Sequence, residues 1–153
     1  MNTAIINSDS YEKHNTGDGH PEQPKRAIAI KEKLNKRNDL IWETPVSVPD
    51  DILAMTHSKE YIENLKDSFP QKGLMFLDGD TVVSPESKKA VFDAAGSTIR
   101  AIDGIENNQF KNAFCLARPP GHHAEKNKAM GFCCISNAGV ATNYLINQYK
   151  YKR

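Results

Sequence analysis

Two adjacent histidines stand in a stiff loop in the last third of the chain. Residues 118–124 read Arg-Pro-Pro-Gly-His-His-Ala, and the sequence Gly-Phe-Cys follows at residues 131–133. Histidine is the side chain that titrates near neutral pH, so His122 and His123 are suited to moving protons. Two imidazoles on a rigid turn predict a proton-transfer pair beside a metal ion or a polarised carbonyl group.

The run just before this loop predicts where the histidines lie in the fold. Residues 113–117, Ala-Phe-Cys-Leu-Ala, are apolar and end at a proline pair, as expected of a buried strand in a parallel sheet. Ligands of open α/β sheets bind at the carboxyl ends of strands. Adjacent side chains of a plain strand point to opposite faces, and the Pro-Pro-Gly sequence breaks that alternation, so both imidazoles can converge on one cavity. The alternative is a surface turn with two solvated histidines.

Short apolar runs alternate with amphipathic segments along the rest of the chain. Strands are expected at residues 4–6 and 40–48, and Pro45 makes the second an edge strand or limits its length. Helices are expected at residues 24–38, 50–55, 58–69, 84–103 and 137–148. Residues 70–83 show little periodicity and are expected to form a long loop. This order predicts an α/β fold with three αβα layers around a mainly parallel sheet.

The longest predicted helix has recognisable ends. Ser84 and Pro85 are typical of a helix start, with serine as the cap and proline at the first position. The helix is expected to end near Asp103, with Gly104 as the stop signal.

Composition limits the class of protein. The chain has 153 residues and a formal net charge of +1, which predicts one domain and favours neither nucleic acid nor membrane as a partner. No apolar run approaches the length of a membrane span, and the N-terminus lacks the pattern of a secretory signal. The three cysteines, Cys115, Cys133 and Cys134, are an odd count without a disulfide pattern. We expect all three cysteines to act as small buried hydrophobic residues. Their pattern also favours a reducing, cytoplasmic setting for the protein.

Four stretches in one order resemble the N-terminal part of the histone deacetylase superfamily, which includes acetylpolyamine amidohydrolases and acetoin-utilisation proteins. They are Gly-His-Pro-Glu-Gln-Pro-Lys-Arg at 19–26, Leu-Asp-Gly-Asp-Thr at 77–81 with Ser-Pro-Glu-Ser at 84–87, the 118–124 loop, and Gly-Phe-Cys at 131–133. The resemblance covers essentially the whole chain. It implies the arginase/deacetylase form of the αβα fold and hydrolysis of an acetyl amide by a zinc-bound water.

The resemblance also assigns roles to the residues of the active-site core. His123 would be the general base, and His122 its electrostatic partner. Gly131 would offer its backbone carbonyl to the substrate amide. Phe132 would form one wall of a narrow channel that holds the acylated side chain.

Two further substrate-binding residues follow from the earlier stretches. Arg26 would line an inner cavity behind the site, and Asp80 would contact the substrate at the rim. For Asp80 and its neighbour Asp78 the alternative is an ordinary turn-forming role. His20 is interpreted as a loop-shaping residue and His57 as a local structural or surface residue, because a metal site needs convergent partners.

The resemblance places the zinc ligands and the transition-state tyrosine after the next strand, beyond Arg153. No metal ligand is therefore assigned within these 153 residues. Residues 1–153 would be the N-terminal portion of a single deacetylase domain, incomplete at its C-terminus. A truncated gene, an incomplete record, an expressed fragment and one piece of a split protein all agree with this interpretation.

Three functions remain open from the sequence. The first is zinc-dependent hydrolysis of an acetyl amide, in acetyl-lysine, an acetylpolyamine or another small acyl amide, in a protein that can be oligomeric. The second is a non-catalytic fragment that binds acyl groups, or one half of a split enzyme. The third is an unrelated cysteine or histidine hydrolase, for which Cys133 is the only candidate nucleophile.

Overall fold

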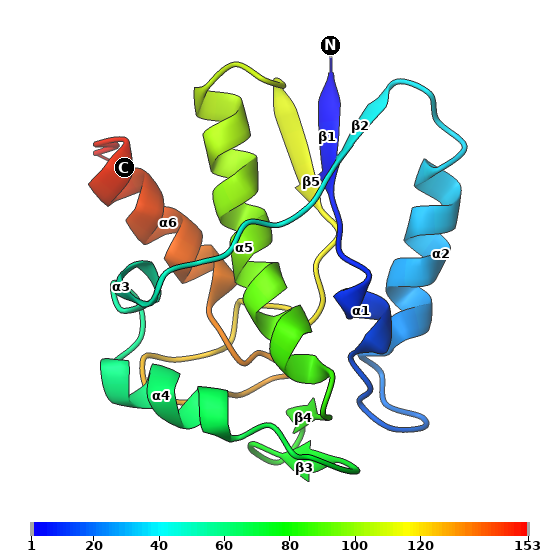
Figure 1. Ribbon diagram of the computed structural model, residues 1–153, viewed down its shortest axis with the longest axis vertical. Helices are drawn as coiled ribbons and strands as arrows, with labels where there is room; N and C mark the ends of the chain where they lie inside the picture. Colours follow the sequence, from blue (N-terminus) through cyan, green and yellow to red (C-terminus); the bar gives the residue numbers. More distant parts are fainter. Residues whose placement is uncertain (1, 153) are drawn as a thin grey trace.

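A sheet of three parallel strands lies at the centre of the computed structural model, which describes residues 2–152 (Figure 1). β1 (Thr3–Ile6) is the middle strand, with β2 (Leu40–Glu43) on one side and β5 (Asn112–Cys115) on the other. Both neighbours run parallel to β1, which confirms the predicted parallel sheet. β2 is an edge strand that ends before Pro45, because proline has no N–H to donate to a ladder.

Six helices and a small hairpin surround this sheet in the described part of the chain. The helices are α1 (Ser10–Lys13), α2 (Pro24–Leu34), α3 (Asp50–Leu53), α4 (Lys59–Asp67), α5 (Ser87–Glu106) and α6 (Asn137–Gln148). β3 (Met75–Phe76) and β4 (Val82–Val83) pair antiparallel within the segment that was expected to be an irregular loop. No helix among residues 2–152 is long and apolar enough to cross a membrane.

The alternation of β1 side chains places helices on both faces of the sheet. Ala4 and Ile6 pack with Ala101 of α5, whereas Ile5 packs with Ala27 of α2 on the opposite face. Figure 1 shows α2 and α5 on either side of the strands. The predicted three-layer αβα arrangement is therefore confirmed.

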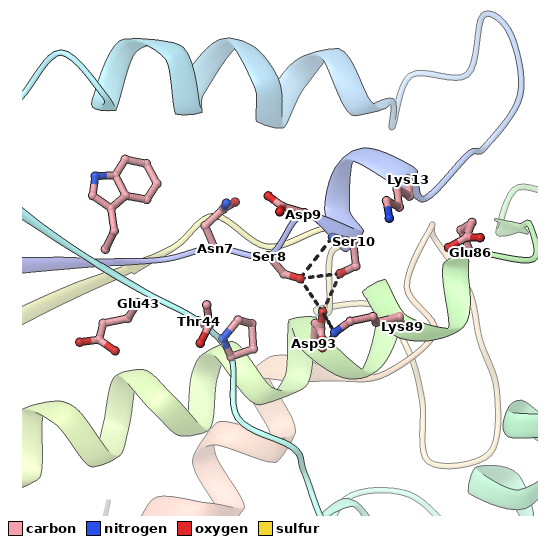
Figure 2. A pocket seen from close by; sticks show the side chains of 12 residues that line it. Asn7, Ser8, Asp9, Ser10, Lys13, Glu43, Thr44, Glu86, Lys89 and Asp93 are labelled. Atoms are coloured by element: carbon pink, nitrogen blue, oxygen red, sulfur yellow. Dashed lines mark hydrogen bonds and ion pairs between the residues drawn. The ribbon is translucent and has the colours of Figure 1, made fainter.

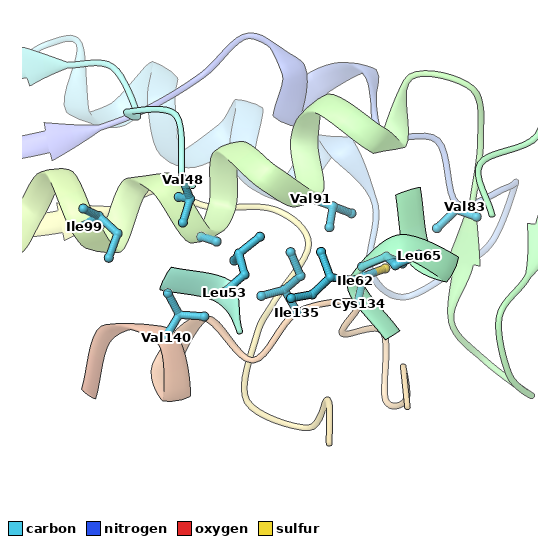
Figure 3. Close-up of a cluster of buried hydrophobic side chains, with 11 residues drawn as sticks. Val48, Leu53, Ile62, Leu65, Val83, Val91, Ile99, Cys134, Ile135 and Val140 are labelled. Carbon is cyan, nitrogen blue, oxygen red and sulfur yellow. The ribbon is translucent and has the colours of Figure 1, made fainter. Parts of the chain in front are cut away.

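The largest apolar cluster lies on the outer side of α5, where α3, α4 and α6 pack against it (Figure 3). Its buried members are Val48, Leu53, Ile62, Leu65, Val83, Val91, Ala95, Ile99, Cys134, Ile135 and Val140. Serine caps set two of these helices: Ser58 accepts a hydrogen bond from the Tyr61 N–H in α4, and Ser136 accepts one from the Gly139 N–H in α6. The cluster includes Cys134 and Ile135, which directly follow the Gly-Phe-Cys sequence, so it anchors the chain at that point.

Both predicted ends of the longest helix were wrong. α5 begins at Ser87 rather than at Pro85, because the Ser84 hydroxyl lies against the Ser87 side chain, 2.9 Å away, and does not cap a helix. The helix also continues past Gly104 to Glu106. Gly104 is needed for packing instead, since a Cβ atom there would overlap the ring of Phe110.

β5 has a single strand neighbour within residues 2–152. Phe114 lies on the same sheet face as Ile5, but it is not part of the cluster that packs with α2 on that face, and it remains 46% exposed. An unpaired edge beside an exposed aromatic ring is a ready surface for another strand or chain.

Candidate active site

The histidine loop leaves the sheet at a topological switch point. The chain passes from β1 to α2 on one face, and from β5 towards α6, which packs with α5 on the other face. Crevices that bind ligands in open α/β sheets form at such points, at the carboxyl ends of the strands. The predicted position of the histidine loop is confirmed, because it follows the carboxyl end of a parallel strand.

His122 and His123 lie side by side at the surface of the described residues. Their ring centroids are 4.3 Å apart, with an angle of 60° between the ring planes. Both side chains are exposed. The loop therefore overcomes the alternation of an extended strand and brings the two imidazoles together.

Cys133 holds the backbone of this histidine pair from below. Its sulfur lies 3.4 Å from the backbone nitrogens of both His122 and His123, which donate to it. The thiol in turn donates to the Gly131 carbonyl oxygen, 3.3 Å away. Cys133 is completely buried, and its hydrogen bonds join the histidine loop to Gly131. We call this set of contacts the Cys133 bracket.

Gly131 allows the ring of His123 to pack directly on the backbone. Its φ of +58° lies in the left-handed region that favours glycine. A Cβ atom at this position would lie only 2.8 Å from His123 Cδ2. The Gly131 carbonyl accepts from Cys133 and keeps a second lone pair, so its predicted contact with a substrate amide stays a prediction.

Phe132 is held in an unusual backbone conformation beside the histidines. Its φ is +68°, although it is not a glycine. Its N–H donates to Thr81 Oγ1 at 3.1 Å, and its ring meets His20 edge to face, with the centroids 4.9 Å apart. The ring is partly exposed, and its role as a channel wall stays a prediction.

The turn between β3 and β4 places Asp80 near Phe132. Asp78 accepts hydrogen bonds from the N–H groups of Asp80 and Thr81, at 3.0 and 2.7 Å. Although burial raises the pKa of Asp78, these hydrogen bonds lower it below its usual range. Asp78 therefore has a turn-forming role. Asp80 is exposed and accepts from His20 Nε2 through its backbone carbonyl, 3.1 Å away, so substrate contact by its carboxylate stays a prediction.

A buried ion pair connects the early loop to the histidine loop. The Arg118 guanidinium donates from Nε to Glu22 Oε1 at 2.6 Å and from Nη2 to Oε2 at 2.8 Å. It also donates to the carbonyl oxygens of Tyr11 and His14. Neither Glu22 nor Arg118 was predicted to have a role, although each stands in one of the stretches that resemble the histone deacetylase superfamily. The available signal in the sequence was one acidic and one basic residue, each next to a proline, in two separate motifs.

Arg26 was expected to line an inner cavity, whereas its side chain is largely exposed. Its side chain is 64% exposed, and it approaches Glu22 at 3.9 Å. Among the described residues, the buried guanidinium behind the histidine loop belongs to Arg118. A cavity role for Arg26 stays a prediction.

The remaining histidines have structural roles. His57 was interpreted as structural or surface, and it is buried: its Nε2 accepts from the Ser136 N–H at 2.9 Å, and its Nδ1 faces the Lys126 carbonyl oxygen at 3.3 Å. His14 is buried against Ser87 Oγ. Burial, followed by the positive charge of Arg118, lowers the pKa of His14 to about 3.

The described residues do not fit a zinc site by themselves. No group of three or more His, Cys, Asp or Glu side chains among residues 2–152 is arranged to hold a metal ion. Asp18 and His20 have an Asp-x-His spacing, but both ring nitrogens of His20 face backbone groups, of Glu22 and Asp80. A metal at this site would need ligands other than these residues.

The cysteines do not favour the alternative of a cysteine hydrolase. Burial raises the pKa of Cys115 to about 11 and that of Cys134 to about 12, so both thiols are protonated at neutral pH. The Cys133 thiol is buried, and its hydrogen bonds engage backbone groups. The predicted role as small buried hydrophobic residues suits Cys133 and Cys134, while Cys115 is partly exposed.

A separate hollow of about 540 Å³ lies beside the carboxyl ends of β1 and β2 (Figure 2). Ser8 and Ser10 both donate to the same carboxylate oxygen of Asp93, and Lys89 forms an ion pair with it. The polar side chains of Ser8, Ser10, Lys89 and Asp93 thus already have partners in one another. The hollow is lined by neither histidine of the pair, so it is distinct from the candidate active site.

Comparison with known proteins places this chain and its fold in one family. The profile of the histone deacetylase domain matches residues 20–153. The uncharacterized protein slr0245 of Synechocystis sp. is 40% identical over 154 residues, which cover 95% of this chain and 49% of that protein. A probable deacetylase of Methanothermobacter thermautotrophicus is 36% identical over 144 residues, which cover 92% of this chain and 41% of that protein. The crystal structure of the HDA15 HD domain matches with a TM-score of 0.86 at 29% identity, over 97% of this chain and 44% of that one.

The chain belongs to the histone deacetylase domain family, as the resemblance of its motifs predicted. The structural match confirms the deacetylase form of the α/β fold. The chain spans about half or less of the length of the relatives that it matches.

Proposed function

We propose that this chain supplies the histidine half of an active site that hydrolyses acetyl amides. The observation that carries the proposal is the contact between His122 and His123, bracketed by Cys133, on the segment that the family profile matches. Residues 1–153 would form the N-terminal portion of a single deacetylase domain. Acetyl-lysine and acetylpolyamines are the proposed substrate classes.

In the proposed reaction, water attacks the acetyl carbonyl carbon and loses a proton to His123. Proton transfer by a positioned histidine contributes roughly 10²–10⁴-fold to a rate. His122, whose ring lies 4.3 Å from that of His123, would stabilise the charge that develops nearby. Return of the proton to the amide nitrogen releases the amine and leaves acetate.

Zinc dependence is proposed from the family alone. The ligands would come from outside residues 2–152, since these residues do not form a metal site. Phe132, Gly131, Asp80 and Arg26 keep their proposed roles around the substrate.

The test is hydrolysis by the protein expressed from its natural gene, with acetyl-lysine peptides and acetylspermidine as substrates and acetate release as the signal. We expect His123→Gln to lower kcat by about 10²-fold or more. Asn127→Ala, an exposed substitution in the turn that follows the histidine loop, serves as the matched control and should leave the rate unchanged. Equal rates for both variants and the parent protein would refute the assignment, and binding of the acetylated peptide without turnover would favour the acyl-binding alternative.

A further inference from the structure

Three segments that are distant in the sequence meet at Phe132. They are the loop before α2, which carries His20, the β3–β4 turn, which carries Thr81, and the Gly-Phe-Cys sequence itself. The left-handed backbone conformation of Phe132 is unfavourable for a residue with a Cβ atom. Neighbouring groups must therefore hold it in place.

Thr81 is the first of these groups. Its Oγ1 accepts from the Phe132 N–H at 3.1 Å, and the residue is almost fully buried. Its own backbone is fixed twice, because its N–H donates to Asp78 at 2.7 Å and its carbonyl accepts from the Leu77 N–H at 2.8 Å. The hydroxyl of Thr81 is thus a rigid acceptor for a strained residue.

His20 is the second group. Its ring meets that of Phe132 at an angle of 71°. His20 Nδ1 lies 3.1 Å from both the backbone nitrogen and the carbonyl oxygen of Glu22, and Nε2 donates to the Asp80 carbonyl at 3.1 Å. Backbone groups therefore face both ring nitrogens, so the ring is fixed against the side of Phe132.

We infer that Thr81 and His20 are positioning residues that fix the Phe132 ring and thereby limit the length of the acyl group that the site accepts. The inference rests on the proposed acetyl hydrolysis. A Phe132 backbone held by Thr81 and a ring braced by His20 cannot turn aside to admit a longer chain. One methylene group in an apolar pocket changes kcat/KM by roughly 10–200-fold, so small movements of this wall alter selectivity.

Two substitutions of Thr81 separate the effect of its hydrogen bond from the effect of its side-chain shape. Thr81→Val keeps the branched shape and removes the acceptor, whereas Thr81→Ser keeps the acceptor. In the protein from its natural gene, we expect Thr81→Val to reduce the acetyl-to-butyryl ratio of kcat/KM on lysine peptides by about tenfold, mainly through KM. Thr81→Ser should stay close to the parent ratio. His20→Ala should shift the ratio in the same direction as Thr81→Val, and His20→Phe should restore part of it.

Hydrogen exchange of the Phe132 amide gives a second readout that does not depend on activity. We expect faster exchange in Thr81→Val than in Thr81→Ser, at equal melting temperature or after correction for it. Parent selectivity together with parent exchange in Thr81→Val would overturn the inference. A parent protein that hydrolyses no acyl-lysine peptide would instead refute the proposed function, and the exchange rates would still decide whether Thr81 holds Phe132.

Discussion

Glu22 and Arg118 form a bidentate ion pair in the interior of the protein, although they are 96 positions apart in the sequence. Glu22 is 1% exposed, and the remaining donors of Arg118 reach the backbone carbonyls of Tyr11 and His14. The pair joins the loop that supplies His20 to the loop that supplies the histidine pair of the candidate active site. The geometry of the candidate active site therefore depends on a contact that lies outside it.

Breaking this pair should destabilise the fold strongly, because an unpaired buried charge is left behind. We expect Glu22→Gln to lower the free energy of unfolding by about 3–5 kcal/mol, measured by urea denaturation. Arg118→Lys should also destabilise, since an ammonium group cannot reproduce the fork of hydrogen bonds. The matched control is Arg37→Lys in the exposed pair with Asp39, where solvent screens the charges and we expect little change in the free energy of unfolding. Equal losses for the two arginine variants would contradict the importance of the buried pair.

The sequence predicted the layers of the fold more accurately than the residues at which its helices and strands begin and end. Apolar runs and helical periodicity depend only on residues that are close together in the sequence. They were therefore sufficient to predict the three strands of the central sheet. The end of α5 was misplaced because Gly104 serves a tertiary contact with Phe110, which no local signal reveals. The short hairpin of β3 and β4 was missed for a similar reason, since two-residue strands carry too little periodicity to detect.

The residues of the candidate site were predicted individually, but the contacts that support them were not. The histidine pair was evident from the loop that carries it. The bracket by Cys133, the Thr81 acceptor and the Glu22–Arg118 pair all join segments that are distant in the sequence. One sequence gives the chemical type of each residue, while its partner is set by how the loops meet at the carboxyl end of the sheet.

His14 should make the protein less stable in mild acid. Its pKa in the folded protein is about 3, lowered by burial and then by Arg118, whereas an unfolded chain binds the proton near pH 6.5. Glu22 lies 3.7 Å from His14, but Arg118 neutralises that carboxylate, so it does not restore the pKa. Between about pH 6.5 and 3 the unfolded state binds more protons than the folded state, so stability falls as the pH falls.

The contribution of His14 can be isolated by substitution. We expect the free energy of unfolding of the parent protein to drop between pH 7.5 and pH 5, and His14→Gln to show a smaller drop. His57→Gln is the comparison, because burial lowers the pKa of His57 as well. Urea titrations at the two pH values measure the effect, and an identical drop in parent and His14→Gln would show that His14 does not contribute.

Gly131 should tolerate no side chain, for two separable reasons. A Cβ atom there is strained by the positive φ and collides with the ring of His123. We expect Gly131→Ala to lower the free energy of unfolding by more than about 1 kcal/mol and to displace His123, reducing any hydrolysis. Gly73→Ala shares the positive φ but meets open space, and Gly79→Ala has neither problem. Thermal melts should rank the losses as Gly131→Ala, then Gly73→Ala, then Gly79→Ala, and any other order would refute the role of the His123 contact.

The open edge of β5 should make the isolated chain associate. Phe114 is 46% exposed beside backbone groups of β5 that have no strand partner within residues 2–152, and such edges pair with other chains. We expect the isolated 153-residue chain to aggregate or to bind a separately expressed C-terminal half of a related deacetylase domain. Light scattering after size exclusion measures this, and Phe114→Arg should reduce the association. Phe76→Arg places the same change on the β3–β4 hairpin, where the ring is 64% exposed, and should leave association unchanged. A monodisperse, cooperatively melting monomer would contradict the prediction, and equal effects of the two arginine variants would assign the association to general surface apolarity rather than to the β5 edge.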